Sequence, residues 1–421
     1  MSSPANRVAA ANAPDARPLR FVTAASLFDG HDAAINIMRR LIQAQGAEVI
    51  HLGHNRSVED VVRAALQEDA DAIALSSYQG GHVEYFKYMV DMLKERNASH
   101  IRVFGGGGGT ITPEEIAELQ AYGVERIYHP NDGMHLGLVA MIEDVVRRTS
   151  ESRAKRNASD VGARLRATDG SGDSGRPQGG LLQEHADLSD EIAIAHQLSA
   201  IENGELSDAE MQHLRKQWQL AGGKTPVIGL TGTGGAGKSS VTDELLNRFL
   251  ASFPEMRIAV VSVDPTRRRT GGALLGDRIR MNSLRSKRVF MRSMATRRQH
   301  MATNVVLKDC ISFLKSLGYD LVIVDPPSFA PTHRALPTAL AAYRELHRLA
   351  LAAVAPGGLL AAASCSSHVP EAEFLATLLD AAQQTRRRLR ILEIHGQPAD
   401  HPTLPAFPEG RYLKFILCRV D

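Results

Sequence analysis

Between Leu19 and Arg148, short apolar runs alternate with stretches in which apolar residues recur every three or four positions. The short runs indicate buried strands, and the periodic stretches indicate amphipathic helices. The predicted strands are Arg20–Ala24, Glu48–Leu52, Ala72–Ser76, Arg102–Phe104 and Arg126–Tyr128. The predicted helices are Ala33–Gln45, Val58–Gln67, Val83–Arg96, Pro113–Ala121 and His135–Arg147. This alternation predicts a parallel sheet with helices on both faces, and five strands fit a flavodoxin-like domain.

The composition changes after Arg148, where Thr149–Leu188 is rich in Ser, Gly, Asp and Arg and predicts a linker. Helical patterns follow at Glu191–Ile201 and at Asp208–Leu220, with Asp208 as the expected N-cap of the second. A second α/β region begins at Pro226. Its predicted elements are a helix from Lys238 and strands at Val227–Leu230, Arg257–Val263, Leu321–Val324, Leu359–Ala363 and Lys414–Arg419.

Bulk properties restrict the class of protein only loosely. The formal net charge of +2 does not favour nucleic acid, although the basic stretch Arg267–Arg298 fits either a phosphate or acidic partner, or a solvated face. The three scattered cysteines suggest a reducing compartment. The segment Met1–Arg20 lacks the apolar core of a secretory signal, and no apolar run reaches membrane-spanning length. We therefore expect a cytoplasmic protein without a membrane partner.

The first candidate site is a loop that carries a histidine. Asp29 and His31 follow the first predicted strand and open the first helix, at the sheet edge where such folds bind ligands. His31 can offer a ring nitrogen to a metal, and Asp29 can accept the other ring N–H; a polar loop that caps a helix is the alternative. Two small-residue loops at the same edge, Ser76–His82 and Gly105–Thr110, favour a large ligand lying against the backbone.

The Asp29–His31 loop and the two small-residue loops resemble a known cofactor-binding domain. Phe21–Arg148 resembles the cobalamin-binding domain of methylmalonyl-CoA-type mutases, and among them the fused isobutyryl-CoA mutases. The family motif Asp-x-His-x-x-Gly is matched at Asp29 and His31, with Ala34 at the position of the glycine. The resemblance implies that His31 binds the cobalt of adenosylcobalamin. It implies a slot for the nucleotide tail of the cofactor lined by Ser76, Ser77, Gly80, Gly81, Gly105, Gly106, Gly107 and Thr110.

The second candidate site is a phosphate-binding loop. Residues Gly232–Ser239 fit G-x-x-x-x-G-K-[ST] between a strand and a helix, so that backbone N–H groups would hold phosphates, Lys238 would neutralise charge and Ser239 would hold Mg²⁺. Asp264, after the next strand, is a candidate Mg²⁺ ligand, or a cap before Pro265. The expected nucleotide-binding residues are Gly232, Gly234, Gly235, Ala236, Gly237, Lys238, Ser239 and Ser240.

The stretch Thr225–Val324 resembles the GTPase that chaperones cobalamin mutases, through this loop and the run Gly271–Met281. The resemblance implies GTP as the nucleotide and Mg²⁺ linked to Asp264 and Asp277. It stops after Val324, because neither the Gly-rich switch nor the guanine-reading Asn-Lys-x-Asp of the family follows. The barrel that binds acyl-CoA in these mutases is also absent from the sequence.

Tyr319–Asp421 resembles the C-terminal half of the class I methyltransferases that make 5-methylcytosine in ribosomal RNA. The matching runs are Asp325–Phe329, Pro356–Gly358, Ser364–Ser366, Ala399–Pro402 and Pro408–Lys414. The resemblance implies Cys365 as the nucleophile toward cytosine C6 and Asp325 as a residue that holds the base; a buried small hydrophobe is the alternative for Cys365. The Gly-rich loop for S-adenosylmethionine is missing, so neither that cofactor nor methylation is expected.

The two resemblances meet near 319–325 and predict a chimera. The expected order is a disordered N-terminus (1–18), a cobalamin-binding domain (19–148), a linker (149–190), a helical connector (191–224), a truncated P-loop GTPase domain (225–324) and a methyltransferase-like part (325–421) that continues the GTPase sheet. The expected function is a cobalamin- and GTP-binding module of an adenosylcobalamin-dependent acyl-CoA mutase, a carbon-skeleton isomerase, inactive without the barrel. Mutase subunits or a second copy are the expected protein partners. The alternatives are a ribosomal RNA methyltransferase, with RNA as partner, and a GTPase chaperone for cobalamin loading.

Overall fold

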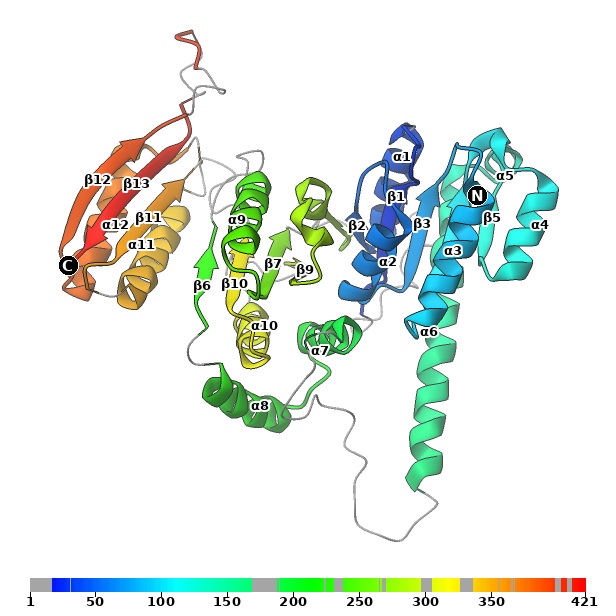
Figure 1. Ribbon diagram of the computed structural model, residues 1–421, viewed down its shortest axis with the longest axis horizontal. Helices are drawn as coiled ribbons and strands as arrows, with labels where there is room; N and C mark the ends of the chain where they lie inside the picture. The colour runs from blue at the N-terminus through cyan, green and yellow to red at the C-terminus, as the bar shows by residue number, and fades with distance from the viewer. Residues whose placement is uncertain are drawn as a thin grey trace, which may run out of the picture. The chain divides into compact units, whose positions relative to one another are not determined.

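Figure 1 shows the computed structural model of the chain. The chain divides into two compact units. The first comprises the described residues within 17–226, 249–296 and 305–322, and the second those within 227–248 and 323–421. One boundary falls inside a helix, between Arg248 and Phe249, and another inside a strand, between Val322 and Ile323. The described residues are 17–30, 32–168, 188, 190–222, 225–230, 238–264, 266, 270–296, 305–325, 336–354, 356–364, 366, 368–397, 403–406 and 411–421.

The first sheet has the strand order β5-β4-β3-β1-β2-β8. Its first five strands are parallel and have the order of a flavodoxin-like sheet, which confirms the predicted fold class. The register pairs Ala25 with Ser76 and Ser76 with Gly106, so the carboxyl ends of β1, β3 and β4 are level. The bounds are β1 Arg20–Ala25, β2 Glu48–His51, β3 Ala72–Ser76, β4 Arg102–Gly106, β5 Arg126–Tyr128 and β8 Ala273–Leu275.

Helices cover both faces of this sheet, as predicted (Figure 1). One core cluster joins apolar side chains of α2, α3 and α4 to Val22, Ile73 and Val103, and another joins α1 and α6 to Phe21 and Phe104. Alternate residues of each strand therefore face opposite cores. The bounds are α1 Asp32–Ala44, α2 Val58–Gln67, α3 His82–Glu95, α4 Pro113–Tyr122, α5 Pro130–Leu136 and α6 Leu138–Thr168.

The helix predicted to end at Arg147 continues through α6 to Thr168, into the stretch predicted as a linker. Its apolar stripe fades after Val146, which is why the pattern suggested a linker, but no proline interrupts this stretch. Ion pairs between Arg147 and Glu151 and between Arg148 and Asp144 stabilise the helix surface.

Two shorter helices follow, α7 (Glu191–Asn203) and α8 (Asp208–Ala221). The N-cap of α8 is Ser207 and not Asp208: the Ser207 hydroxyl accepts from the Glu210 N–H, and the Glu210 side chain accepts from the Ser207 N–H. This reciprocal capping box uses two backbone donors that a cap at Asp208 would leave unpaired.

The second sheet has the order β6-β10-β7-β9. Strand β9 was not predicted; it pairs in parallel with β7, for example Ser262 with Ser293. Strand β8 was also not predicted; it pairs in parallel with β2. The bounds are β6 Val227–Gly229, α9 Lys238–Ser252, β7 Ile258–Asp264, β9 Val289–Ala295, α10 Val305–Ser316 and β10 Leu321–Asp325.

Part of the basic stretch Arg267–Arg298 is internal. Arg278 and Arg292 are buried and form ion pairs with Glu68 and Glu202. A solvated face or a phosphate-binding patch is therefore the wrong interpretation for these two residues. Their charges are matched inside the first unit.

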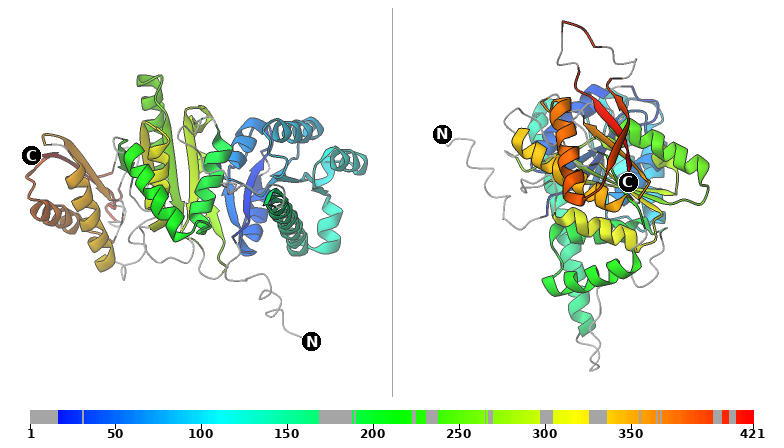
Figure 2. Two further views of the ribbon diagram at one scale, coloured as in Figure 1. Left: turned by 90° about the horizontal axis from the view of Figure 1, so that it is seen from below. Right: turned by 90° about the vertical axis from the view of Figure 1, so that its left-hand side faces the viewer.

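The last three strands, β11 (Leu359–Ser364), β12 (Leu389–His395) and β13 (Lys414–Val420), form an antiparallel sheet of their own in the order β11-β13-β12 (Figure 2). The expectation that they continue the P-loop sheet is therefore wrong for the described strands. Strand β13 has a hydrogen-bonded partner on each side, and its buried alternate residues pack with helices α11 (Leu336–Ala353) and α12 (Glu371–Thr385). None of the described helices is both long and apolar enough to cross a bilayer.

Candidate functional site

Three loops are tied together at the carboxyl edge of the first sheet. Asp29, 2 % exposed, accepts the backbone N–H of Tyr78 at 3.0 Å through Oδ2. The Ser26 hydroxyl donates to the Ser77 hydroxyl at 2.9 Å, and the Ser77 N–H donates to the Gly106 carbonyl at 2.8 Å. The loops after β1, β3 and β4 thus form one hydrogen-bonded edge. Asp29 and Ser77 both belong to this edge, whereas His31 lies outside the described residues.

The glycines after β4 serve the packing of the protein itself. A Cβ on Gly105 would overlap the Phe86 ring, and one on Gly107 would overlap the Ser77 carbonyl oxygen. Gly108 has a left-handed backbone, with φ +59°. The close approach of the loops after β3 and β4 therefore requires glycine at 107 whether or not a ligand is present.

Other glycines at this edge border open space. Within the described part of the chain, a Cβ on Gly30, Gly80 or Gly109 would meet no atom within 4 Å. These positions lie on the loops after β1, β3 and β4, the same three loops that the hydrogen bonds join. Backbone is thus accessible along the edge without an intervening side chain. The Gly81 N–H is not free, because it donates to Gln79 Oε1 at 2.5 Å, and the Thr110 hydroxyl donates to the Gly107 carbonyl at 2.5 Å.

Phe28 was missed by the sequence analysis. Its side chain is 83 % exposed beside Asp29, its φ is +64°, and its N–H donates to Asn55 Oδ1 at 2.9 Å. A large apolar side chain held outward in a left-handed turn adds apolar surface to the edge that Asp29 borders. The available signal was its position directly before Asp29 in the loop.

The residues of the phosphate-binding loop from Gly232 to Gly237, which include Gly234, Gly235 and Ala236, lie outside the described residues. Lys238 opens helix α9 in the second unit, with its carbonyl accepting the Thr242 hydroxyl at 2.9 Å. Ser239 is buried and Ser240 is exposed. The described part of the motif is therefore the first turn of a helix, as the motif requires.

Asp264 and Asp277 both belong to the first unit. Asp264 is the last residue of β7, and the Asp277 carboxylate accepts a hydrogen bond from the Ser262 hydroxyl. Because Ser262 and Asp264 are two residues apart on one strand, they point to the same face of the sheet. The structure therefore places Asp277 at the face of β7 that carries Asp264, an arrangement that suits two carboxylates near one Mg²⁺.

The residues expected for methyl transfer stand at the end of β10 and directly after β11. Cys365 and the side chain of Asp325 lie outside the described part of the chain. The neighbouring Ser364 is buried, and its hydroxyl lies 2.9 Å from the Tyr343 hydroxyl. The end of β11 is thus packed against α11.

Comparison with known families identifies two domains. Residues 19–133 match the family described as B12 binding domain, and residues 194–327 match the family described as methylmalonyl Co-A mutase-associated GTPase MeaB. The predicted resemblances to a cobalamin-binding domain and to a cobalamin-mutase GTPase are confirmed. The chain therefore contains a B12-binding domain followed by a MeaB-type GTPase domain.

Curated relatives support the same division. The chain is 52 % identical over 315 residues to a fused isobutyryl-CoA mutase of Geobacillus kaustophilus, covering 73 % of this chain and 27 % of the relative. It is 50 % identical over 330 residues to a fused isobutyryl-CoA mutase of Cupriavidus metallidurans, covering 77 % and 28 %. It is 41 % identical over 102 residues to ribosomal RNA large subunit methyltransferase I of Serratia proteamaculans, covering 24 % and 26 %. The chain thus spans about a quarter of the length of each of these relatives.

Proposed function

We propose that this chain, which joins a B12-binding domain to a MeaB-type GTPase domain, is a cobalamin- and GTP-binding module of an adenosylcobalamin-dependent acyl-CoA mutase. The observation that carries the proposal is the hydrogen-bonded edge formed by Asp29, Ser77 and Gly106 in a sheet of flavodoxin-like order. The ancestral reaction would be a carbon-skeleton isomerisation, such as that of isobutyryl-CoA. The acyl-CoA would be bound by a mutase subunit or by another part of such an enzyme.

In this proposal His31 binds cobalt through one ring nitrogen and donates its other N–H to Asp29. Asp29 is buried and already oriented by the Tyr78 N–H, so the imidazole would meet a fixed acceptor. The open space beside Gly30, Gly80 and Gly109 suits a large ligand that lies along the loops. When bound, adenosylcobalamin supplies a cobalt–carbon bond for radical chemistry.

Cobalamin binding is tested by replacing the proposed ligand. In a spectral titration with adenosylcobalamin, the unaltered chain should bind with the absorption spectrum of a histidine-ligated cobalamin. His31→Ala should bind at least about 100-fold more weakly and without that spectrum, because the metal loses its protein ligand. His213→Ala removes an exposed histidine of α8 and should leave the titration unchanged. Equal binding by the chain and His31→Ala would contradict the assignment of His31.

Nucleotide binding is tested in the same protein. Lys238→Ala should weaken GTP binding by about 100-fold, because the lysine neutralises phosphate charge at the start of α9. Arg248→Ala, which removes an exposed cation from the same helix, is the matched control and should bind GTP normally. Fluorescent GTP displaced by unlabelled GTP or ATP gives both affinities. Undiminished binding by Lys238→Ala would show that the loop does not act as a phosphate site.

Methyl transfer is not part of the proposed function. The likeness to the methyltransferase covers 26 % of that relative, and the Gly-rich cofactor loop expected upstream is replaced by the GTPase domain. Residues of 336–421 nevertheless form their own core around Tyr343, Phe374 and Ile416. We infer a folded segment that does not perform the reaction of its relative.

A further inference from the structure

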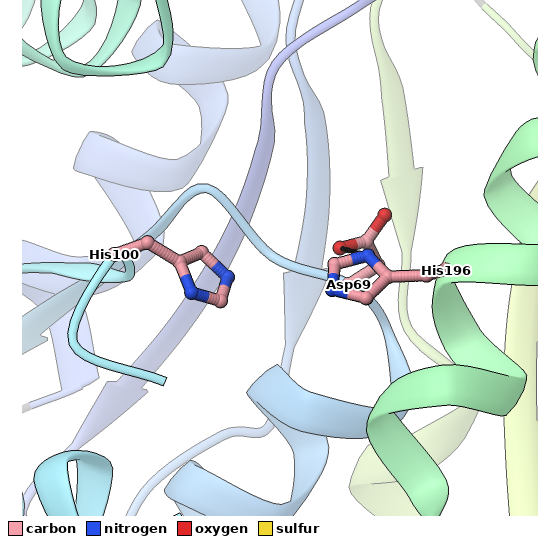
Figure 3. A group of neighbouring side chains, drawn as sticks. All are labelled: Asp69, His100 and His196. Atoms are coloured by element: carbon pink, nitrogen blue, oxygen red, sulfur yellow. Dashed lines mark ion pairs between the residues drawn. The ribbon is translucent and has the colours of Figure 1, made fainter. Parts of the chain in front are cut away.

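A cluster of titratable side chains lies at the other edge of the first sheet. Asp69 precedes β3, His100 precedes β4, and His196 projects from α7 (Figure 3). Because β3 and β4 are parallel, Asp69 and His100 both lie at amino ends of strands, opposite the edge that carries Asp29. The cluster is therefore separate from the proposed cobalamin site and independent of it.

The three side chains lie close enough to one another to reach a shared metal ion. Asp69 Oδ1 and His196 Nδ1 are 2.8 Å apart, and the His100 and His196 ring centroids are 6.1 Å apart. One candidate ligand atom from each residue lies within 4.8 Å of the other two. Tetrahedral bonds of about 2.1 Å place ligand atoms about 3.4 Å apart, so movements of about 1 Å suffice.

The Asp69 carboxylate has a charged neighbour, Arg17, at the oxygen that does not face His196. The Asp69 side chain is 1 % exposed, and its Oδ2 lies 3.4 Å from Arg17 while Oδ1 faces His196. Asp69 can thus give one oxygen to a metal while Arg17 keeps the other, as carboxylate ligands commonly do.

His100 is available as a ligand. Among the described residues its ring contacts His196 but makes no hydrogen bond. One ring nitrogen of His100 lies within 4.8 Å of the candidate ligand atoms of Asp69 and His196.

We propose that Asp69, His100 and His196 bind one divalent transition-metal ion of the zinc class and so fasten α7 to the B12-binding domain. Two imidazole nitrogens and one carboxylate oxygen are a ligand set that Zn²⁺ accepts, with a water molecule in the fourth position. Helix α7 is also held by its buried apolar residues and by ion pairs of Glu191 with Arg63 and of Glu202 with Arg292 and Arg20. The metal would add an attachment near the middle of the helix.

The test uses the full chain free of nucleotide and cobalamin, titrated with Zn²⁺ against a chromophoric chelator. We expect one tightly bound zinc ion per chain and at least about 100-fold weaker binding by His100→Ala and His196→Ala. His213→Ala, which removes an exposed histidine from α8, should bind zinc normally. Zinc should raise the thermal unfolding midpoint of the unaltered chain but not that of His196→Ala. His31→Ala should keep the site, which separates it from the cobalamin loop.

Three results would overturn the proposal. One is a zinc affinity of the unaltered chain weaker than about 1 mM. Another is unchanged affinity in both histidine variants, and the third is loss of the site in His31→Ala. Because Asp69 is buried beside Arg17, Asp69→Asn is a less safe variant, and the histidine variants decide the outcome. Their far-ultraviolet circular dichroism should match that of the unaltered chain.

Discussion

Replacing Glu68 by alanine is expected to lower the free energy of unfolding by about 3–5 kcal/mol. Glu68 is fully buried and lies between two parts of the chain that are distant in sequence. Its carboxylate accepts Arg278 Nε at 2.7 Å, the Ser293 N–H at 3.0 Å and Arg20 at 3.3 Å. The variant would remove the carboxylate paired with the buried Arg278 and one of the three carboxylates around Arg20. Removing one partner of a buried ion pair is costly, because the other charge stays buried.

The measurement is chemical unfolding followed by circular dichroism and by the fluorescence of Trp218, which is buried in the first unit. Glu118→Ala is the matched control, because its carboxylate pairs with Lys87 at the surface and its loss should leave the unfolding midpoint essentially unchanged. If Glu68→Ala and the control unfolded at the same denaturant concentration, the buried network would not stabilise the first unit.

Acidification from pH 7 to pH 4 is expected to destabilise the C-terminal unit by about 3 kcal/mol through His347 alone. His347 is 4 % exposed on α11 and meets the Phe374 ring edge-on at 5.2 Å. Burial lowers its pKa from 6.5 to about 4. Between about pH 6.5 and pH 4, His347 is therefore protonated in the unfolded chain but stays neutral in the folded chain. The contribution is complete above pH 6.5 and is lost progressively as the pH falls toward 4.

Hydrogen exchange of peptides from 336–385, corrected for intrinsic rates, measures this effect in the unit concerned. His347→Gln removes the titration while leaving a polar group near the Thr377 hydroxyl, and should flatten the dependence of protection on pH. His395→Gln removes an exposed histidine of β12 and should leave the dependence as it was. An unchanged pH profile in His347→Gln would assign the acid sensitivity to other groups.

Most of the first sheet could be predicted from local pattern, because its strands are fully buried and its helices amphipathic. Strand β3 and helix α2 have the predicted bounds. Strand β9 escaped prediction because Arg292 and Ser293 interrupt its apolar run. The guanidinium of Arg292 is tolerated there only because Glu202, 90 residues earlier, lies 2.8 Å from it. The sequence around Arg292 does not include Glu202, so the local pattern could not show that an arginine is stable in this strand.

The Asp29 loop and the Asp69 cluster also differ in how far a local sequence pattern reveals them. The meeting of the loops after β1, β3 and β4 was predictable, because these strands are neighbours in one parallel sheet. The role of Gly107 was not, since only the packed structure shows that it accommodates the Ser77 carbonyl. Asp69, His100 and His196 gave no sequence signal, because 127 residues separate the first from the last. The meeting of α7 with the turns before β3 and β4 has to be seen in three dimensions.

Strand β8 has a consequence for how such chains can be rearranged by evolution. The segment that follows β7 supplies the outermost strand of the B12-binding sheet, covering the backbone of β2. A gene break between residues 133 and 194 would separate the two family matches by sequence, yet it would expose β2 as an open edge prone to intermolecular pairing. A break at β10 preserves the pairing of β8 with β2, along with the contacts of Glu68 with Arg278 and Ser293. The B12-binding sheet and the segment that supplies β8 therefore form one structural piece, and a different segment could follow β10 without removing a strand from the first sheet.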